Sequence, residues 1–143
     1  MNVNFKKLVR EAVTPTYATS GSACFDLYSM TSGVVRGDLP LQCATGIAVE
    51  VPDDHVMLVF SRSGHGFKDD VRLANCVGVI DSDYRGEINV KMTAERHSKG
   101  MSVHKGDRIA QGMIIPVTQI NFREVSELTT TFRGEGGMGS TGA

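Results

Sequence analysis

Apolar residues along this chain occur in short runs, and in several runs they alternate with polar residues. Successive side chains of a β-strand point to opposite faces, so alternation predicts strands with one buried face. The alternating apolar positions are Ile88, Val90 and Met92 in one segment and Ile47, Val49 and Val51 in another. Residues 56–60 are apolar throughout, which predicts a strand that is buried on both faces.

A late strand is expected at residues 113–116 and is expected to continue through Ile120 and Phe122. Pro116 favours a sheet edge or a strand end, because it cannot donate a ladder hydrogen bond. Turns are predicted at residues 36–38, 52–54 and 105–107. Since no long helical periodicity occurs, at most one short helix is expected, near residues 64–69. The pattern therefore predicts an all-β sandwich or barrel of about eight or more short strands.

Length and charge narrow the class of protein. The chain has 143 residues, which predicts one domain with one core. Its 15 Lys and Arg residues against 16 Asp and Glu residues leave a net charge of -1, so we expect no direct nucleic-acid binding. No apolar run approaches the roughly 18 residues of a membrane span, and residues 1–7 lack the apolar core of a signal peptide. We expect no membrane association and a cytoplasmic location, in the host cytoplasm if the source is a phage or a virus.

Cysteines and histidines show no pattern for metal binding. Cys24, Cys43 and Cys76 are odd in number and too far apart for a zinc site, so we expect reduced thiols in or near the core. The four histidines lack metal-ligand spacing and are expected at surface or turn positions. Any catalysis must then use carboxylates, arginines and a borrowed metal.

The last eleven residues, 133–143, are rich in glycine and keep no strand pattern. They form either a disordered tail or a loop whose backbone N–H groups close around an anion, between Arg133 and the pair Ser140 and Thr141. A G-x-G-x-x-G spacing occurs there, but only four residues follow it, too few for the helix of a dinucleotide site.

Two polar groups follow apolar strands directly. Arg62, Ser63 and Gly64 could clamp a phosphate, with an ordinary surface turn as the equal alternative. Asp81 closes an apolar segment and could act as a base, although such a residue more often caps a turn. Gln111 interrupts a further apolar strand, where a glutamine usually bonds to neighbouring backbone.

Taken together, five segments resemble the five ordered motifs of the homotrimeric dUTPase (deoxyuridine 5'-triphosphate nucleotidohydrolase) family, across nearly the whole chain. They are residues 22–27 (SACFDL), 62–66 (RSGHG), 75–86 (NCVGVIDSDYRG), 106–111 (GDRIAQ) and 133–142 (RGEGGMGSTG). Chance agreement at five places in the right order is not credible.

The resemblance implies a jelly-roll β-sandwich or distorted barrel over residues 1–128 and a flexible glycine-rich arm over residues 129–143. It also implies a homotrimer with shared active sites, in which the arm of one subunit closes the site of a neighbour. The implied reaction converts dUTP to dUMP and pyrophosphate, which limits uracil incorporation into DNA and supplies dUMP for thymidylate synthesis.

The resemblance further implies the roles of single residues. Asp81 would hold and deprotonate the water that attacks the α-phosphorus. Mg²⁺ would be chelated by the three phosphates, with Asp26 reaching it through water. The implied substrate-binding residues are Arg62, Ser63, Gly64 and Gln111 at the phosphates, Asn75 and Gly78 at the uracil, Tyr84 at the deoxyribose, and Arg133, Met138, Gly139, Ser140 and Thr141 in the arm.

Two positions depart from the family pattern. Met138 stands where an aromatic residue usually stacks on the uracil, so the closed arm is expected to be weaker or more transient than usual. Cys24 stands where the first motif usually has glycine.

Two rival interpretations remain at this stage. The first is a deoxycytidine triphosphate deaminase, alone or bifunctional, which needs an acid where this chain has Lys91. The second is a non-enzymatic module that uses the same fold for structure or for regulation. An additional protein partner of an enzyme is compatible with either the dUTPase or the deaminase interpretation.

Overall fold

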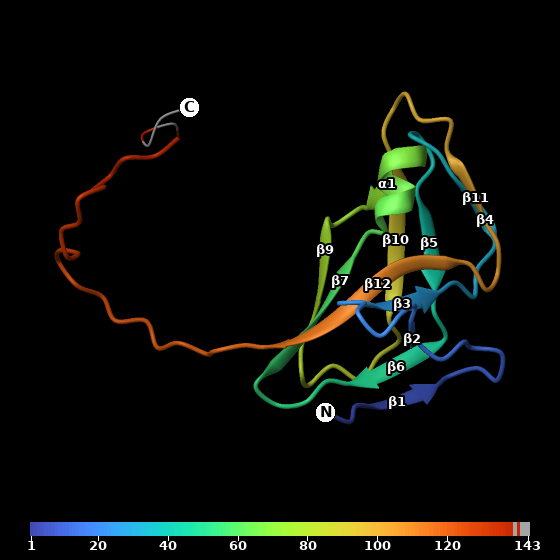
Figure 1. Ribbon diagram of the computed structural model, residues 1–143, viewed down its shortest axis with the longest axis horizontal. Helices are drawn as coiled ribbons and strands as arrows, with labels where there is room; N and C mark the ends of the chain where they lie inside the picture. Colours follow the sequence, from blue (N-terminus) through green and yellow to red (C-terminus); the bar gives the residue numbers. More distant parts are fainter. Residues whose placement is uncertain (139, 141–143) are drawn as a thin grey trace.

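Twelve β-strands and one short helix make up the part of the chain that the structure describes, residues 1–138 and 140 of a computed structural model (Figure 1). In chain order they are β1 (Asn4–Lys7), β2 (Thr16–Tyr17), β3 (Phe25–Tyr28), β4 (Gly33–Val35), β5 (Leu41–Ala44), β6 (Ile47–Glu50), β7 (His55–Phe60), α1 (Ser63–Asp69), β8 (Val71–Leu73), β9 (Val77–Ile80), β10 (Asn89–Ala94), β11 (Met101–Val103) and β12 (Arg108–Pro116). The predictions of an all-β chain and of one short helix near residues 64–69 are confirmed.

Two sheets hold most of the strands. One sheet has five strands in the order β2-β3-β12-β7-β9, and the other has three in the order β5-β10-β8. β1 pairs with β6, and β4 pairs with β11, in two smaller sheets. The short link between β8 and β9 connects the three-stranded sheet to the edge of the five-stranded sheet. This link matters for function, because Asn75 lies on it and Gly78 lies just after it on β9.

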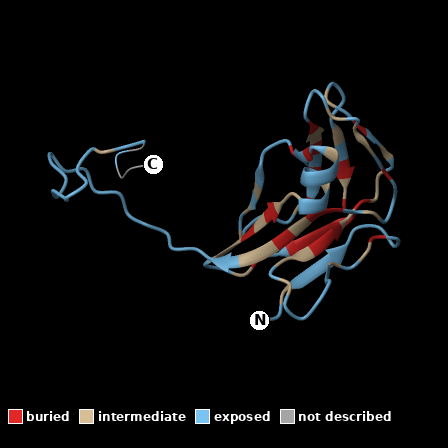
Figure 2. Cartoon of the chain, turned by 45° about the horizontal axis from the view of Figure 1, so that its top comes forward, coloured by how far each residue is buried: buried red, intermediate tan, exposed pale blue. Residues whose placement is uncertain are grey.

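The core lies between these sheets and draws side chains from both. Alternation is clearest along β10, where Val90, Met92 and Ala94 are buried while Asn89 and Lys91 are exposed. Burying these apolar side chains is the main force that holds the sheets together, at about 1.5–3 kcal/mol for each large one. Figure 2 shows the buried residues gathered in this body and the described part of the C-terminal segment almost entirely exposed.

Two strands differ from the predicted burial. Met57 and Val59 of β7 are buried, but the other face of this strand is only half-buried, so the prediction of two buried faces is wrong. The reason is that β7 packs on the core with one face of the five-stranded sheet. In β6, Ala48 is buried between Ile47 and Val49, so that strand is covered on both faces instead of alternating.

The turns predicted at residues 36–38, 52–54 and 105–107 are all present. Pro116 ends β12, as predicted. The continuation of this strand through Ile120 and Phe122 is wrong, because both residues are exposed and lie outside any strand. From residue 117 onward the chain leaves the body (Figure 1). The division into residues 1–128 and 129–143 stays a prediction.

The three cysteines are free thiols, as expected. Cys43 is buried and Cys24 is half-buried, but Cys76 is exposed, so the expectation of a position in or near the core is wrong for Cys76. Cys76 lies in the tight β8–β9 link, with a φ of 62°, and this turn keeps its side chain out of the core. Within the described residues, no helix is long and apolar enough to span a membrane.

Candidate active site

A buried carboxylate is the centre of the first half of the site. Asp26, on β3, is 8% exposed, and both of its oxygens are ion-paired. Oδ1 lies 3.4 Å from Nε of Arg62, and Oδ2 lies 3.2 Å from Nη1 of Arg108. Arg62 also donates from Nη1 to the backbone oxygen of Arg108 at 3.2 Å. A carboxylate that is removed from water needs such partners, so the three side chains hold one another in place and are called the Asp26 cluster below.

A β-bulge brings Arg108 to this cluster. Strict alternation along β12 would place Arg108 and Gln111 on opposite faces. Instead, the register shifts between Arg108 and Ala110, so that Gln111 is opposite Asp26 and Arg108 is opposite Tyr28. Residues 26 and 28 share a face of β3, and the bulge therefore turns Arg108 toward Asp26. Sequence reasoning missed Arg108 for this reason.

The predicted phosphate-contacting residues lie next to the Asp26 cluster. Arg62 is the N-cap residue of α1, and Ser63 and Gly64 begin the helix. Gln111 donates from Nε2 to the backbone oxygen of Ser61 at 3.0 Å. This bond ties the middle of β12 to the loop that carries Arg62, so the structure brings Arg62, Ser63, Gly64 and Gln111 together.

His65 also lies next to the Asp26 cluster, although the sequence analysis expected it at a surface or turn position. It lies half-buried on α1, with Nε2 3.5 Å from Nη1 of Arg62. Its Nδ1 is buried and has no hydrogen-bond partner among the described residues. Burial lowers the pKa of His65, and the charge of Arg62 lowers it further, against opposing effects of Asp69 and Asp107. A neutral His65 can therefore accept a hydrogen bond from Arg62.

Cys24 lies beside the same cluster. Burial raises the pKa of its thiol, and the negative charge of Asp26 raises it further. Cys24 therefore stays protonated and packs as a small, weakly polar side chain next to the carboxylate.

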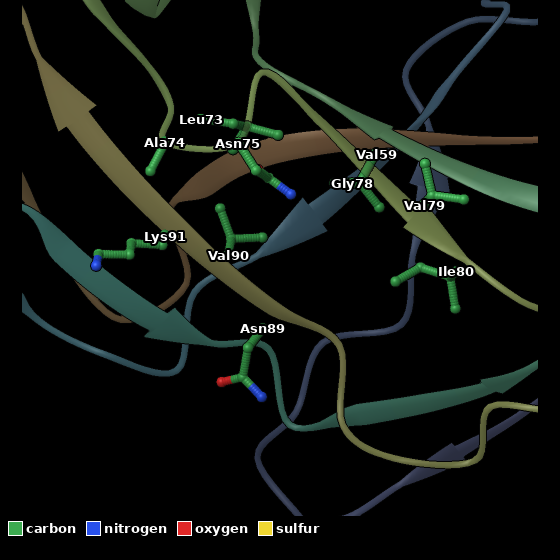
Figure 3. Close-up of a pocket in the computed structure, with 10 residues that line it drawn as sticks. All are labelled: Val59, Leu73, Ala74, Asn75, Gly78, Val79, Ile80, Asn89, Val90 and Lys91. Atoms are coloured by element: carbon green, nitrogen blue, oxygen red, sulfur yellow. The ribbon is translucent and has the colours of Figure 1, made fainter.

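The second half of the site begins with a cavity of about 440 Å³ (Figure 3). Its lining residues come from β7, β8, β9, β10 and the β8–β9 link, and they include Val59, Asn75, Gly78, Ile80, Val90 and Lys91. In Figure 3 the side chain of Asn75 points toward Gly78, whereas the amino end of Lys91 points away from Asn75. A Cβ atom on Gly78 would lie 3.1 Å from Cβ of Val59 and 3.8 Å from Nδ2 of Asn75. Glycine at position 78 therefore keeps this cavity open.

A smaller cavity of about 270 Å³ adjoins the first. Both cavities are lined by Val79, Ile80 and Asn89, and the smaller one adds Asp81, Tyr84 and Glu87. The hydroxyl of Tyr84 donates to the backbone oxygen of Glu87 at 3.1 Å, which fixes the ring. Tyr84 folds over Gly86, where a Cβ atom would lie 2.5 Å from Cζ of the ring. Asp81 is exposed and directly follows β9, so its carboxylate is accessible to water.

The two halves do not meet on a single chain. β9 pairs with β7 so that Val77 is opposite Phe60, next to the Asp26 cluster, and Ile80 is opposite Met57. Asp81 therefore lies at the far end of β9, and the length of that strand alone, four residues, separates the two ends by about 10 Å. The predicted residues form two groups, one around Asp26 and one around Asp81.

The predicted arm residues belong to neither of these two groups. Arg133 donates from Nε to the backbone oxygen of Gly136 at 2.8 Å, and Gly134 has a φ of 51°, which favours glycine. Met138 is fully exposed, and Ser140 is exposed as well. Gly139 and Thr141 lie outside the described residues. The described residues of the arm therefore form local turns and make no contact with either half of the site.

The metal-binding capacity of the site is small. Across residues 1–138 and 140, no group of three or more His, Cys, Asp or Glu side chains is placed to hold a metal ion. Asp26 offers one carboxylate beside the candidate phosphate-contacting residues. Such a donor set suits Mg²⁺ that arrives with a nucleotide, because this ion keeps its waters and combines one or two carboxylates with substrate phosphates.

Comparison with known proteins decides the family. The family model described as dUTPase matches residues 10–142. The chain belongs to the dUTPase family. The deoxyuridine 5'-triphosphate nucleotidohydrolase of Nautilia profundicola is 40% identical over 142 residues, which cover 99% of each chain.

Two solved dUTPase structures share the fold. The dUTPase of Staphylococcus bacteriophage 80alpha with dUPNHPP aligns with a TM-score of 0.90 at 24% identity and covers 99% of both chains. A mutant dUTPase from phage phi11 of S. aureus, described with a structural Mg(II) ion, aligns with a TM-score of 0.78 at 21% identity. This alignment covers 93% of the present chain and 99% of the phage chain. The predicted jelly-roll fold of the dUTPase type is confirmed.

Proposed function

We propose that this dUTPase-family protein hydrolyses dUTP to dUMP and pyrophosphate, in active sites formed between copies of the chain. The observation that carries the proposal is the pair of adjoining cavities along β9, one with Asn75 and Gly78 and the other with Asp81 and Tyr84. A nucleotide with its base in the first cavity and its sugar in the second has its α-phosphate at the Asp81 end of β9.

Base selection follows from the first cavity. The amide of Asn75 and neighbouring backbone groups would pair with the donor and acceptor edge of uracil. Cytosine reverses that edge and would leave buried polar groups unpaired, at about 1–3 kcal/mol each. Thymine differs by one methyl group, so its exclusion depends on contact at C5 with the apolar wall of the cavity. In the second cavity, the fixed ring of Tyr84 would pack on the deoxyribose and exclude a 2′-hydroxyl.

Asp81 would act as the general base. In-line attack on the α-phosphorus requires a water that is held and deprotonated from one side. The carboxylate at the end of β9 is exposed and lies beside the sugar cavity, which suits this role. Pyrophosphate is the leaving group.

The phosphates would be bound by a second copy of the chain. Arg62, Ser63, Gly64 and Gln111 lie beyond one end of β9, while Asp81 lies at the other end. Adjacent phosphorus atoms of a triphosphate are only about 3 Å apart, which is about one residue of an extended strand and less than the length of β9. If the two groups face each other across an interface between copies, one triphosphate can contact both the phosphate-binding residues and Asp81. A closed ring of three copies, as in the homotrimeric family that the motifs resemble, provides three such sites.

Mg²⁺ would be chelated by the three phosphates, and Asp26 would hold it through bound water. When bound, it neutralises phosphate charge and orients the leaving pyrophosphate. The ion pairs with Arg62 and Arg108 fix the Asp26 carboxylate in position for this contact. In the arm of a neighbouring copy, Arg133, Gly139, Ser140 and Thr141 would close on the γ-phosphate, and Met138 would cover the uracil.

The test is steady-state turnover on dUTP, dTTP, dCTP and UTP in parallel, with wild-type protein and Asp81→Asn. We expect hydrolysis of dUTP above the other three. Asp81→Asn should lower kcat by about 10²- to 10⁴-fold and keep nucleotide binding, because only the base is lost.

The matched control is Asp53→Asn, which changes an exposed carboxylate in the turn before β7 and should leave kcat unchanged. Undiminished hydrolysis by Asp81→Asn would overturn the role of this residue. Ammonia released from dCTP would favour the deaminase, and absence of turnover with intact nucleotide binding would favour the non-enzymatic module.

A further inference from the structure

Three phenylalanine side chains, those of Phe67, Phe122 and Phe132, are almost fully exposed in the single chain, and two of them lie next to residues of the proposed site. Phe67, on α1, is 92% exposed, and α1 has no buried residue. Phe132, directly before Arg133, is fully exposed. We propose that Phe132 of one copy packs on Phe67 of another copy when the arm closes, and that this aromatic contact anchors the arm. The inference rests on the proposed function, because it requires Arg133 to reach the phosphate-contacting residues.

The spacing on α1 places Phe67 near those residues. Ser63 is the first residue of the helix, and Phe67 follows four positions later, on the same helix face. Residues at this spacing have Cβ atoms about 5–6 Å apart, and helical side chains lean toward the N-terminus. The ring of Phe67 therefore leans toward Ser63.

The spacing on the arm places Phe132 at the same point. Consecutive Cα atoms lie 3.8 Å apart. An arm that brings Arg133 to the phosphates beside Ser63 brings Phe132 within about one side-chain length of Phe67. Ring centroids of interacting aromatic pairs lie about 4.5–7 Å apart, and that range is compatible with these two spacings.

A second copy is the occupant that the topology favours. The arm leaves the body after Pro116, which is paired with His55 at the start of β7, whereas α1 follows the other end of β7. The backbone N–H of Val117 donates to the backbone oxygen of Asp54 at 2.8 Å. This bond fixes the point where the arm leaves the body at the end of β7 opposite α1. The segment then runs away from its own body (Figure 1). Residues 117–132 can extend by up to about 50 Å, which is enough to reach a neighbouring copy.

The first experiment is a double-mutant cycle on the full chain with Phe67→Ala, Phe132→Ala and the double variant. Each single variant should raise KM for dUTP several-fold, and the double variant should be little worse than either single one, because both remove the same contact. Phe67→Tyr should retain wild-type KM, since an exposed aromatic ring is kept. Additive effects of the two changes, or an unchanged KM in the single variants, would overturn the contact.

The second readout is protection of the arm from limited proteolysis by a non-hydrolysable dUTP analogue. Wild-type protein and Phe67→Tyr should be protected, and Phe67→Ala should need several-fold more analogue for equal protection. Equal protection of Phe67→Ala and wild type would contradict an anchoring role. Matching thermal midpoints show that the fold is not the cause of a difference.

Mixing variants distinguishes a neighbour from the same chain. Co-assembled Phe67→Ala and Phe132→Ala chains regain sites with both rings only if α1 and the arm come from different copies. Recovery of activity above both parents supports the proposal, and no recovery would overturn docking between copies.

A chain that lacks residues 133–143 separates this inference from the proposed function. Loss of turnover in that chain, with Phe67→Ala and Phe132→Ala both normal, would overturn only the aromatic contact. Full turnover in the truncated chain would overturn the role of the arm itself.

Discussion

The Asp26 cluster is stabilised by contacts within one chain, whereas the C-terminal arm has few such contacts. Asp26 is nearly buried and meets both of its arginine partners within one chain. Around Arg133, the arm has only local turns, and Phe132 and Met138 are exposed. Folding alone therefore orders the first region, whereas under the proposed function the second gains its contacts from substrate and from another copy. Ordering the arm costs conformational entropy at the moment of binding.

Removing residues 133–143 tests this contrast most strongly. We expect turnover of dUTP to fall by on the order of 10³-fold, because a cation and several hydrogen-bond donors are lost from the phosphates. The free energy of unfolding should stay unchanged within about 0.5 kcal/mol, since the arm residues that the structure describes do not pack on the body. Turnover assays and urea denaturation measure the two quantities, and a marked loss of stability would contradict the contrast.

Replacing the carboxylate of the cluster should affect both quantities. Asp26→Ala leaves Arg62 and Arg108 facing each other without a counter-charge. Because the arginines are partly exposed, we expect a loss of about 2 kcal/mol in the free energy of unfolding, less than for a fully buried pair, together with weaker nucleotide binding. Asp69→Ala, at the end of α1, is the control for loss of one carboxylate. An unchanged urea midpoint for Asp26→Ala would show that folding does not depend on the cluster.

A smaller effect is expected from moving one side chain at the sugar cavity. In Gly86→Ala, the new Cβ atom clashes with Tyr84, whose ring must leave its hydrogen bond to Glu87. We expect about a tenfold loss in kcat/KM for dUTP and weaker discrimination against UTP. Gly66→Ala is a matched control, because nothing lies within 4 Å of a Cβ atom at that position. Discrimination against UTP that equals the wild type would argue against Tyr84 as the sugar-contacting residue.

The smallest expected effect is a pH dependence. Burial, and then Arg62, lowers the pKa of His65 in the folded protein. An unfolded histidine binds its proton near pH 6.5, so below that pH the unfolded chain binds more protons than the folded one. Stability is therefore lost as pH falls from about 6.5 to the lower pKa of the folded state. Urea midpoints between about pH 5 and pH 7.5 should be flatter for His65→Gln than for wild type, and an equal slope in both proteins would contradict this effect of His65.

Much of the candidate site was predictable because its chemistry is local. Asp81 at the end of an apolar run and Arg62 after another are visible as polar residues that follow β-strands. Arg108 was not visible, because alternation assigns it to the face opposite Gln111 and only the pairing of β12 with β3 reveals the bulge. His65 was not visible either, since its burial depends on what packs against a short helix.

By itself, the sequence determined that the chain is all-β, where its turns at residues 36–38, 52–54 and 105–107 lie, and which five motifs it shares with the dUTPase family. These properties follow from alternation, turn residues and residue identity, which act over a few positions. Only the tertiary structure decided that Asp26 is held by two arginines and that β9 separates the phosphate-contacting residues from Asp81. The physical reason is that strand register and bulges arise from hydrogen bonds between residues far apart in the chain, which no local pattern records.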